Sequence, residues 1–133
     1  MKKILIITGD KCDDSEFFYP YYRLIEEGFA VDVATIDKKD AEAKHYLKIK
    51  SDCSVCNVNT DDYCALLLPG GGAPEKLRIN DDILNSGALY EDSDAVVCEN
   101  IVTSRCPDDL PAFMKNFINI IKKVPILLSH SVN

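Results

Sequence analysis

A chain of 133 residues, of which 47% are hydrophobic, is long enough to fold as one domain with a buried core. A formal net charge of −7 and a pI of about 4.7 argue against a nucleic acid or an anionic membrane surface as partner, because both are negatively charged. We therefore expect a single domain over residues 1–133 that binds neither.

The first residues predict a buried strand at Lys3–Thr8. A signal peptide would need a longer apolar stretch than Ile4–Ile7 and a small-residue cleavage site, and Gly9-Asp10 follow instead. We expect a cytoplasmic protein, in which the six cysteines are reduced thiols and not a disulfide framework.

A helix should follow this strand. Asp14 or Ser15 can cap its free N–H groups, and Gly28 suits the position after a helix end, so the helix should run to about Glu27. Pro20 lies inside this range and predicts a kink or a separate first turn.

The later residues alternate between strand and helix patterns, which predicts an α/β fold with parallel strands and right-handed crossovers. The final helix should bury a face made of Phe113, Phe117, Ile120 and Ile121. The other expected elements are strands at Ala30–Ile36, Tyr46–Lys50 and Cys64–Leu68, a charged loop over Asp37–Lys44, a brief helix from Asp81 through Leu84, a hairpin of Ala95–Val97 and Ile101–Thr103, a helix from Asp108 or Asp109 to about Lys123, and an apolar run Val124–Leu128.

A glycine-rich turn follows the strand at Cys64–Leu68. Pro69 ends the strand, Gly70, Gly71 and Gly72 expose bare backbone N–H groups, and Pro74 suits the first turn of a helix. A strand, a glycine turn and a helix start in this order predict a cradle for an anion or a developing oxyanion. Glycines also form ordinary tight turns, which is the alternative.

Several segments resemble the DJ-1/PfpI family, within the class I glutamine amidotransferase-like superfamily, and they occur in family order. They are residues 2–10 with Asp13-Asp14-Ser15-Glu16, residues 28–33, residues 62–71, residues 100–105 and residues 107–113. The resemblance implies a flavodoxin-like (Rossmann-like) three-layer sandwich with a mainly parallel sheet, reduced in size here, and a homodimer. It also implies relatives among cysteine-dependent peptidase-like hydrolases, glyoxalase- or deglycase-type enzymes and chaperones.

The chain departs from the family at the nucleophile. Leu84-Asn85 is followed almost at once by Gly87-Ala88-Leu89-Tyr90, which resembles family sequence beyond the strand and elbow that carry the catalytic Cys-His pair. By the same resemblance, Glu16 matches the glutamate that hydrogen-bonds this cysteine, and Gly71 and Gly72 match the oxyanion turn. The sequence therefore predicts half of a site without its usual nucleophile.

Three residues are candidates for a replacement nucleophile. Ser129 and His130 end a run that resembles the family's helix-to-elbow passage, and residues 126–128 could enter the sheet beside Cys64–Leu68. Neighbours on an extended strand point to opposite faces, so His130 is poorly placed as a base for Ser129. Cys12 lies in the loop before Glu16, and Cys106 lies beside Arg105 at a helix start, where a thiol pKa can be lowered.

Four residues have a spacing that could suit zinc, namely His45, Cys53, Cys56 and Cys64. Cys64 opens a buried strand and the chain has a single Cys-x-x-Cys pair, so we favour incidental thiols and expect neither a metal nor a cofactor. In the hairpin, Glu99 stands where the family usually has glycine, which argues against a type I′ turn because that turn needs a positive φ there.

Two functions remain open at this point. The first is a degenerate family member without the family's cysteine catalysis that binds a small anion or a partner. The alternative is a PfpI-type hydrolase or glyoxalase/deglycase-like enzyme that uses Ser129, Cys106 or Cys12.

Overall fold

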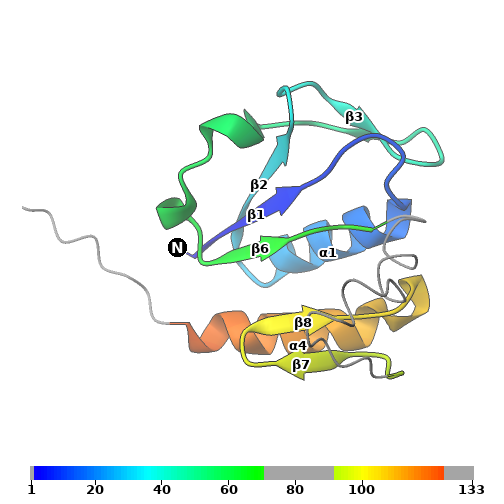
Figure 1. Ribbon diagram of the computed structural model, residues 1–133, viewed down its shortest axis with the longest axis vertical. Helices are drawn as coiled ribbons and strands as arrows, with labels where there is room; N and C mark the ends of the chain where they lie inside the picture. The colour runs from blue at the N-terminus through cyan, green and yellow to red at the C-terminus, as the bar shows by residue number, and fades with distance from the viewer. Residues whose placement is uncertain (1, 71–91, 125–133) are drawn as a thin grey trace, which may run out of the picture.

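The computed structural model describes residues 2–70 and 92–124, and its centre is a four-stranded sheet in the order β5-β2-β1-β6 (Figure 1). Every pairing in this sheet is parallel. Apolar and β-branched residues on the central strands favour extended backbone and burial on both faces. The strands are β1 (Lys3–Ile7), β2 (Ala30–Thr35), β5 (Cys53–Ser54) and β6 (Ala65–Leu67).

Helices α1 (Asp14–Glu26) and α4 (Leu110–Lys123) pack side by side against the sheet (Figure 1). The ammonium group of Lys122 in α4 lies 2.7 Å from the carboxylate of Glu27 at the end of α1. The two helices and the sheet share one apolar core, formed by burial of their facing side chains. Its most enclosed members include Ile4, Ile6, Phe17, Leu24, Val33, Leu67, Met114, Ile118 and Ile121.

The cap of α1 lies one residue earlier than the sequence predicts. Asp13, not Asp14 or Ser15, accepts hydrogen bonds from the N–H groups of Ser15 (3.0 Å) and Glu16 (3.3 Å). The helix continues through Pro20, which is buried inside it, so no separate first turn forms. Gly28 follows the helix with a φ of 88°, a conformation that glycine adopts without a steric cost.

Two short antiparallel hairpins complete the described elements. One pairs β3 (Ala41–Glu42) with β4 (Lys48–Ile49), and the other pairs β7 (Val96–Cys98) with β8 (Ile101–Thr103). The first hairpin replaces part of the charged loop expected over Asp37–Lys44. Three-residue 3-10 helices occur at Val55–Asn57, Thr60–Asp62 and Pro107–Asp109.

The buried face of α4 differs from the expected one by about one residue. Leu110, Met114, Ile118 and Ile121 are buried, whereas Phe113, Phe117 and Ile120 are half-buried at the side of this face. The 3-10 turn at Pro107–Asp109 precedes the helix, so α4 begins after both predicted start residues. The predicted helix from Asp81 and the predicted strand at residues 126–128 lie outside the described residues. Among the described helices, none combines the length and apolar character needed to cross a membrane.

Candidate functional site

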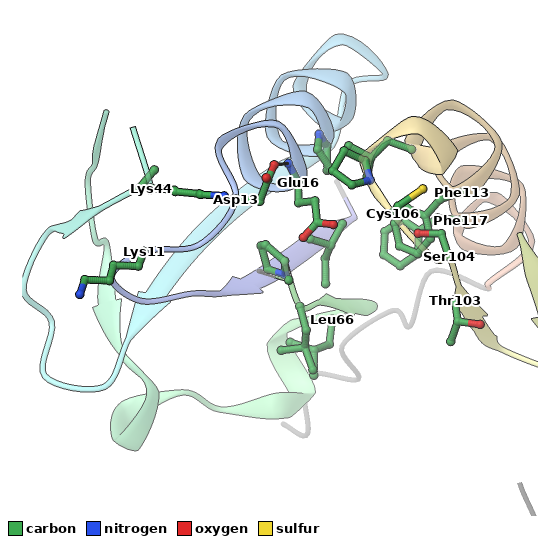
Figure 2. A pocket seen from close by; sticks show the side chains of 18 of the residues that line it. Lys11, Asp13, Glu16, Lys44, Leu66, Thr103, Ser104, Cys106, Phe113 and Phe117 are labelled. Atoms are coloured by element: carbon green, nitrogen blue, oxygen red, sulfur yellow. Dashed lines mark hydrogen bonds between the residues drawn. The ribbon is translucent and has the colours of Figure 1, made fainter. Parts of the chain in front are cut away.

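A cavity of about 1310 Å³ opens at the carboxyl ends of β1 and β6. In open parallel sheets, ligands bind in crevices at this end of the strands. Its walls come from the loop that joins β1 to α1, the β3–β4 hairpin, β6 with residues 68–70, residues 100–107 and α4. Figure 2 shows side chains from these separate segments around one space.

Glu16 is held at this cavity by the first turn of α1. Asp13 caps that turn, and its own N–H donates to the carbonyl of Gly70 at 2.9 Å, which ties the loop to the end of β6. The hydroxyl of Ser15 donates to Asp13 at 2.5 Å, and this bond is the main reason that the pKa of Asp13 is lowered. The cap is therefore an ionised carboxylate at neutral pH, with Glu16 beside it on the cavity wall.

The mouth of the cavity carries charges of both signs. Lys48 pairs with Glu42 across the β3–β4 hairpin. Lys11 and Lys44 also line the mouth, and among the described residues no carboxylate lies within ion-pair distance of either. Lys44 is near enough to Asp13 to lower the pKa of that carboxyl further. Two lysines are thus available to a negatively charged ligand.

Arg105 and Asp109 form the framework of the opposite wall. Arg105 Nε and Nη2 donate to the two oxygens of Asp109 at 2.9 and 3.0 Å, and the Arg105 backbone N–H donates at 3.1 Å. These bonds hold the pKa of the buried Asp109 carboxyl at about 2 and raise the pKa of Arg105. A forked ion pair of this kind fixes direction as well as distance, so it holds residues 104–107 in place.

The six cysteines are all free thiols, and they occupy different environments. Cys12 is buried, with 8% of its surface exposed, and burial is the main cause of its raised pKa. Burial also raises the pKa of Cys64, before β6. Cys106 is the exposed thiol on the cavity wall, and it lies close enough to Asp109 to contribute slightly to the lowered pKa of that carboxyl. Cys12 and Cys64 are therefore thiols and not thiolates at neutral pH.

The four residues with zinc-like spacing do not form a cluster. His45 lies in the β3–β4 hairpin, where its Nδ1 is 3.3 Å from Asp14, while Cys53 pairs in register with Ala34 in the sheet. Cys56 is exposed in a 3-10 helix. Within residues 2–70 and 92–124, no three histidine, cysteine or acidic side chains are grouped so as to hold a metal ion.

The structure brings Glu16 and Cys106 to one cavity, as the family resemblance implies for their two loops. Gly71, Gly72, Ser129 and His130 lie outside the described residues. Sequence reasoning missed Lys44 and the wall formed by the β3–β4 hairpin, because residues 37–44 have the composition of a solvated loop. Asp40 accepts the backbone N–H of the buried Ser51, eleven residues away, and Asp109 accepts that of Arg105, which a sequence pattern does not indicate.

Comparison with known proteins identifies the family. The DJ-1/PfpI family model matches residues 2–86. An uncharacterized protein from Archaeoglobus fulgidus is 32% identical over 166 aligned positions, which cover 91% of this chain and 99% of the relative. The chain belongs to the DJ-1/PfpI family.

Other members of the DJ-1/PfpI family support this result. Deglycase PfpI from Pyrococcus furiosus is 32% identical, with 90% of this chain and 99% of the relative covered. A two-domain protein from Anabaena variabilis, with DJ-1/ThiJ/PfpI-like and ferritin-like domains, superimposes with a TM-score of 0.81 at 24% identity. That match covers 92% of this chain and 48% of the Anabaena protein, and it shows the flavodoxin-like fold.

The alignments also show a difference in length. The alignment with the Archaeoglobus relative extends over 166 positions, whereas this chain has 133 residues. The relative is covered almost completely, so it contains residues that have no counterpart here. This difference supports the predicted loss of a segment relative to other DJ-1/PfpI proteins.

Proposed function

We propose that this DJ-1/PfpI-family chain binds a small anionic molecule at the mouth of the cavity, without the family's cysteine-nucleophile catalysis. The observation that carries the proposal is the composition of the cavity wall. Lys11 and Lys44 line this wall and form no ion pair with another described residue, and Glu16 lines the same cavity.

An anion is favoured over a cation because several carboxylates at the cavity mouth already have hydrogen-bond or ion-pair partners. Asp13 is occupied as the cap of α1, Glu42 pairs with Lys48, and Asp40 accepts the backbone N–H of Ser51 at 2.9 Å. Lys11 and Lys44 form no ion pair with another described residue, although Lys44 lies near enough to Asp13 to lower the pKa of that carboxyl. A carboxylate or phosphate group can therefore gain charge-assisted hydrogen bonds there without displacing existing ones.

The absence of catalysis is proposed from the requirements of the chemistry. A nucleophilic mechanism needs an activated nucleophile, a base and oxyanion donors in one place. Burial raises the pKa of the Cys12 thiol, and the carboxylate nearest to Cys106, Asp109, is already held by three hydrogen bonds from Arg105, so neither thiol has a free base beside it among the described residues.

One observation favours an enzyme as the second candidate. Cys106 is exposed and lines the same cavity as Glu16. Relatives named as deglycases make a hydrolase or glyoxalase/deglycase-like activity through Cys106 the natural alternative, with Cys12 and Ser129 as further candidates.

The experiment measures activity and binding on the full chain. We expect no consumption of methylglyoxal and no ester or peptide hydrolysis above background. Turnover that is abolished by Cys106→Ala, Cys12→Ala or Ser129→Ala would instead establish the enzyme.

Binding is measured by calorimetric titration with inorganic phosphate and, separately, with lactate. We expect Lys44→Gln to weaken binding by about tenfold, the usual effect of losing one charge-assisted contact. Lys50→Gln is the matched control, because Lys50 is exposed and does not line the cavity. Equal losses in both variants would show that net charge, and not this site, attracts the anion.

We also propose a reducing compartment such as the cytoplasm. Six free cysteines without a disulfide among them support this location.

A further inference from the structure

Strand β6 is an edge strand of the described part of the sheet. It pairs with β1 on one side, and no other strand among the described residues pairs with its second side. Leu66 and Leu68 are 49% and 67% exposed, and no charged residue interrupts Ala65–Leu68. Such an edge offers unpaired backbone groups and apolar side chains to a further strand.

The cavity provides the space for that strand. Leu66, Leu67 and Leu68 form one side of it, and the half-buried rings of Phe113 and Phe117 in α4 form the other. The two rings stack with their centroids 5.7 Å apart and face the open region seen in Figure 2. The groove between β6 and α4 is therefore apolar, while the charged groups of the proposed ligand site lie at its mouth.

An apolar segment of this chain is suited to the groove. Residues 125–128 read Pro-Ile-Leu-Leu and follow α4 directly, outside the described residues. A continuous apolar run is the pattern of a strand buried on both faces. The end of α4 lies at the amino end of the sheet, because Lys2 Nζ donates to the carbonyl of Ile121 at 2.6 Å.

The handedness of crossovers argues against insertion into the same molecule. The connection from β1 through α1 to β2 moves toward β5, whereas a step from β6 through α4 to a new outer strand moves the opposite way. Both helices lie on one face, where they contact each other (Figure 1). Two β–α–β crossovers that move in opposite directions along the sheet, with their helices on the same face, have opposite handedness. With a right-handed α1 crossover, the α4 crossover would be left-handed, which is rare.

The backbone at the end of α4 is extended. Val124 ends α4 with a φ of −66° and a ψ of 125°, an extended conformation. Pro125 follows, and a proline restricts the preceding residue to such extended conformations. Extended backbone at Val124 is compatible with a segment that continues away from α4.

We propose that two copies of this chain exchange their C-terminal segments, so that residues 126–128 of each copy form an outer strand on β6 of the other. Exchange of an element between identical chains is a low-cost route to a dimer, because it needs no new complementary surface. In the exchanged dimer the added strand comes from the other copy, so no left-handed crossover from β6 through α4 is needed within one molecule.

The first test is the mass of the full chain in solution, measured by light scattering over a range of concentrations. We expect a dimer for the wild type and a rise of about tenfold or more in its dissociation constant for Leu127→Asp, since the charge would be buried beside leucines. Leu47→Asp is the matched control, because Leu47 is 52% exposed and does not line the cavity. Far-UV circular dichroism verifies that each variant is folded. A monomeric wild type, or a Leu127→Asp variant that dimerises as well as Leu47→Asp, would overturn the proposal.

The second test distinguishes exchange from insertion into the same molecule. The Leu127→Asp variant has an intact groove but a defective C-terminal segment. The Leu68→Asp variant has a defective groove but an intact C-terminal segment. Native mass spectrometry of the mixture should detect a heterodimer that neither variant forms with itself. A mixture that stays monomeric would show that each segment serves its own chain, or neither, and would reject the exchange.

Discussion

Asp109 is a buried carboxyl group whose ionised form is held by Arg105. Its pKa of about 2 lies below the ordinary value of 3.8, so the folded state binds this proton less readily than the unfolded state. The stabilisation is therefore complete above about pH 4 and is lost as the pH falls toward 2.

Asp109→Asn should lower the urea midpoint at pH 7, and the difference from wild type should shrink as the pH falls from 4 to about 2. Asp108→Asn, at the exposed neighbouring position, should have little effect at any pH. A constant difference between wild type and Asp109→Asn across this range would contradict the role of the ion pair.

Glu99 is one of four described non-glycine residues with a positive φ, a conformation that side chains disfavour. Its φ is 51°, so the expectation that Glu99 avoids the left-handed region was wrong. The β7–β8 turn is still not type I′, because Asn100 has no positive φ. Glu99→Gly should raise the free energy of unfolding by about 0.5 to 1 kcal/mol, because glycine adopts this φ without strain. Asn100→Gly, at negative φ, should not stabilise, and chemical denaturation compares the two.

At the level of a single helix, the stability of α1 depends on its N-cap residue, Asp13. Asp13→Ala removes the acceptor for two N–H groups and should cost about 1 kcal/mol of unfolding free energy. Asp13→Asn keeps an acceptor oxygen and should lose clearly less. Equal losses in the two variants at pH 7, measured by urea unfolding, would assign the effect to charge instead of capping.

Longer elements with strong periodicity could be predicted from the sequence, and short ones could not. The strand at Lys3–Ile7 and the helix ending before Gly28 were predicted within one residue or so, because burial and glycine give local signals. Strand β5 was missed, since two residues have no recognisable period and their pairing with Ala34 and Thr35 is tertiary. The N-cap of α1 was predicted one residue too late, because Asp13, Asp14 and Ser15 can each accept the free N–H groups of a helix. The hydrogen bond from Asp13 N–H to the carbonyl of Gly70 is a tertiary contact, which the local sequence does not indicate.

The candidate site was predictable to the extent that its residues follow predicted strands. From the family resemblance, the loops that carry Cys12 and Cys106 were expected to border the site, and Glu16 and Cys106 line one cavity. Lys44 was not expected, because its position depends on a hairpin that joins residues 41–49 to the loop after β1. The bond from Lys11 N–H to the carbonyl of Glu42 at 2.7 Å makes that connection.

At the scale of the whole molecule, α4 closes the core over β1 and α1. Met114 is 1% exposed within this core, so Met114→Ala should cost about 2 to 5 kcal/mol of unfolding free energy. Lys115→Ala, on the exposed side of the same helix, is the matched control and should change stability by less than about 0.5 kcal/mol. A small loss for Met114→Ala would mean that α4 unfolds separately from the sheet, which thermal unfolding with two spectroscopic probes would detect.

The bond between Lys2 and Ile121 joins residues 119 positions apart. During synthesis, Ile4 and Ile6 are made long before α4, the helix that covers them. The apolar side chains of β1 therefore stay uncovered until α4 has been made. Contacts between such distant residues should make folding slow, and chaperones that bind exposed aliphatic strands have their longest opportunity before α4 is made.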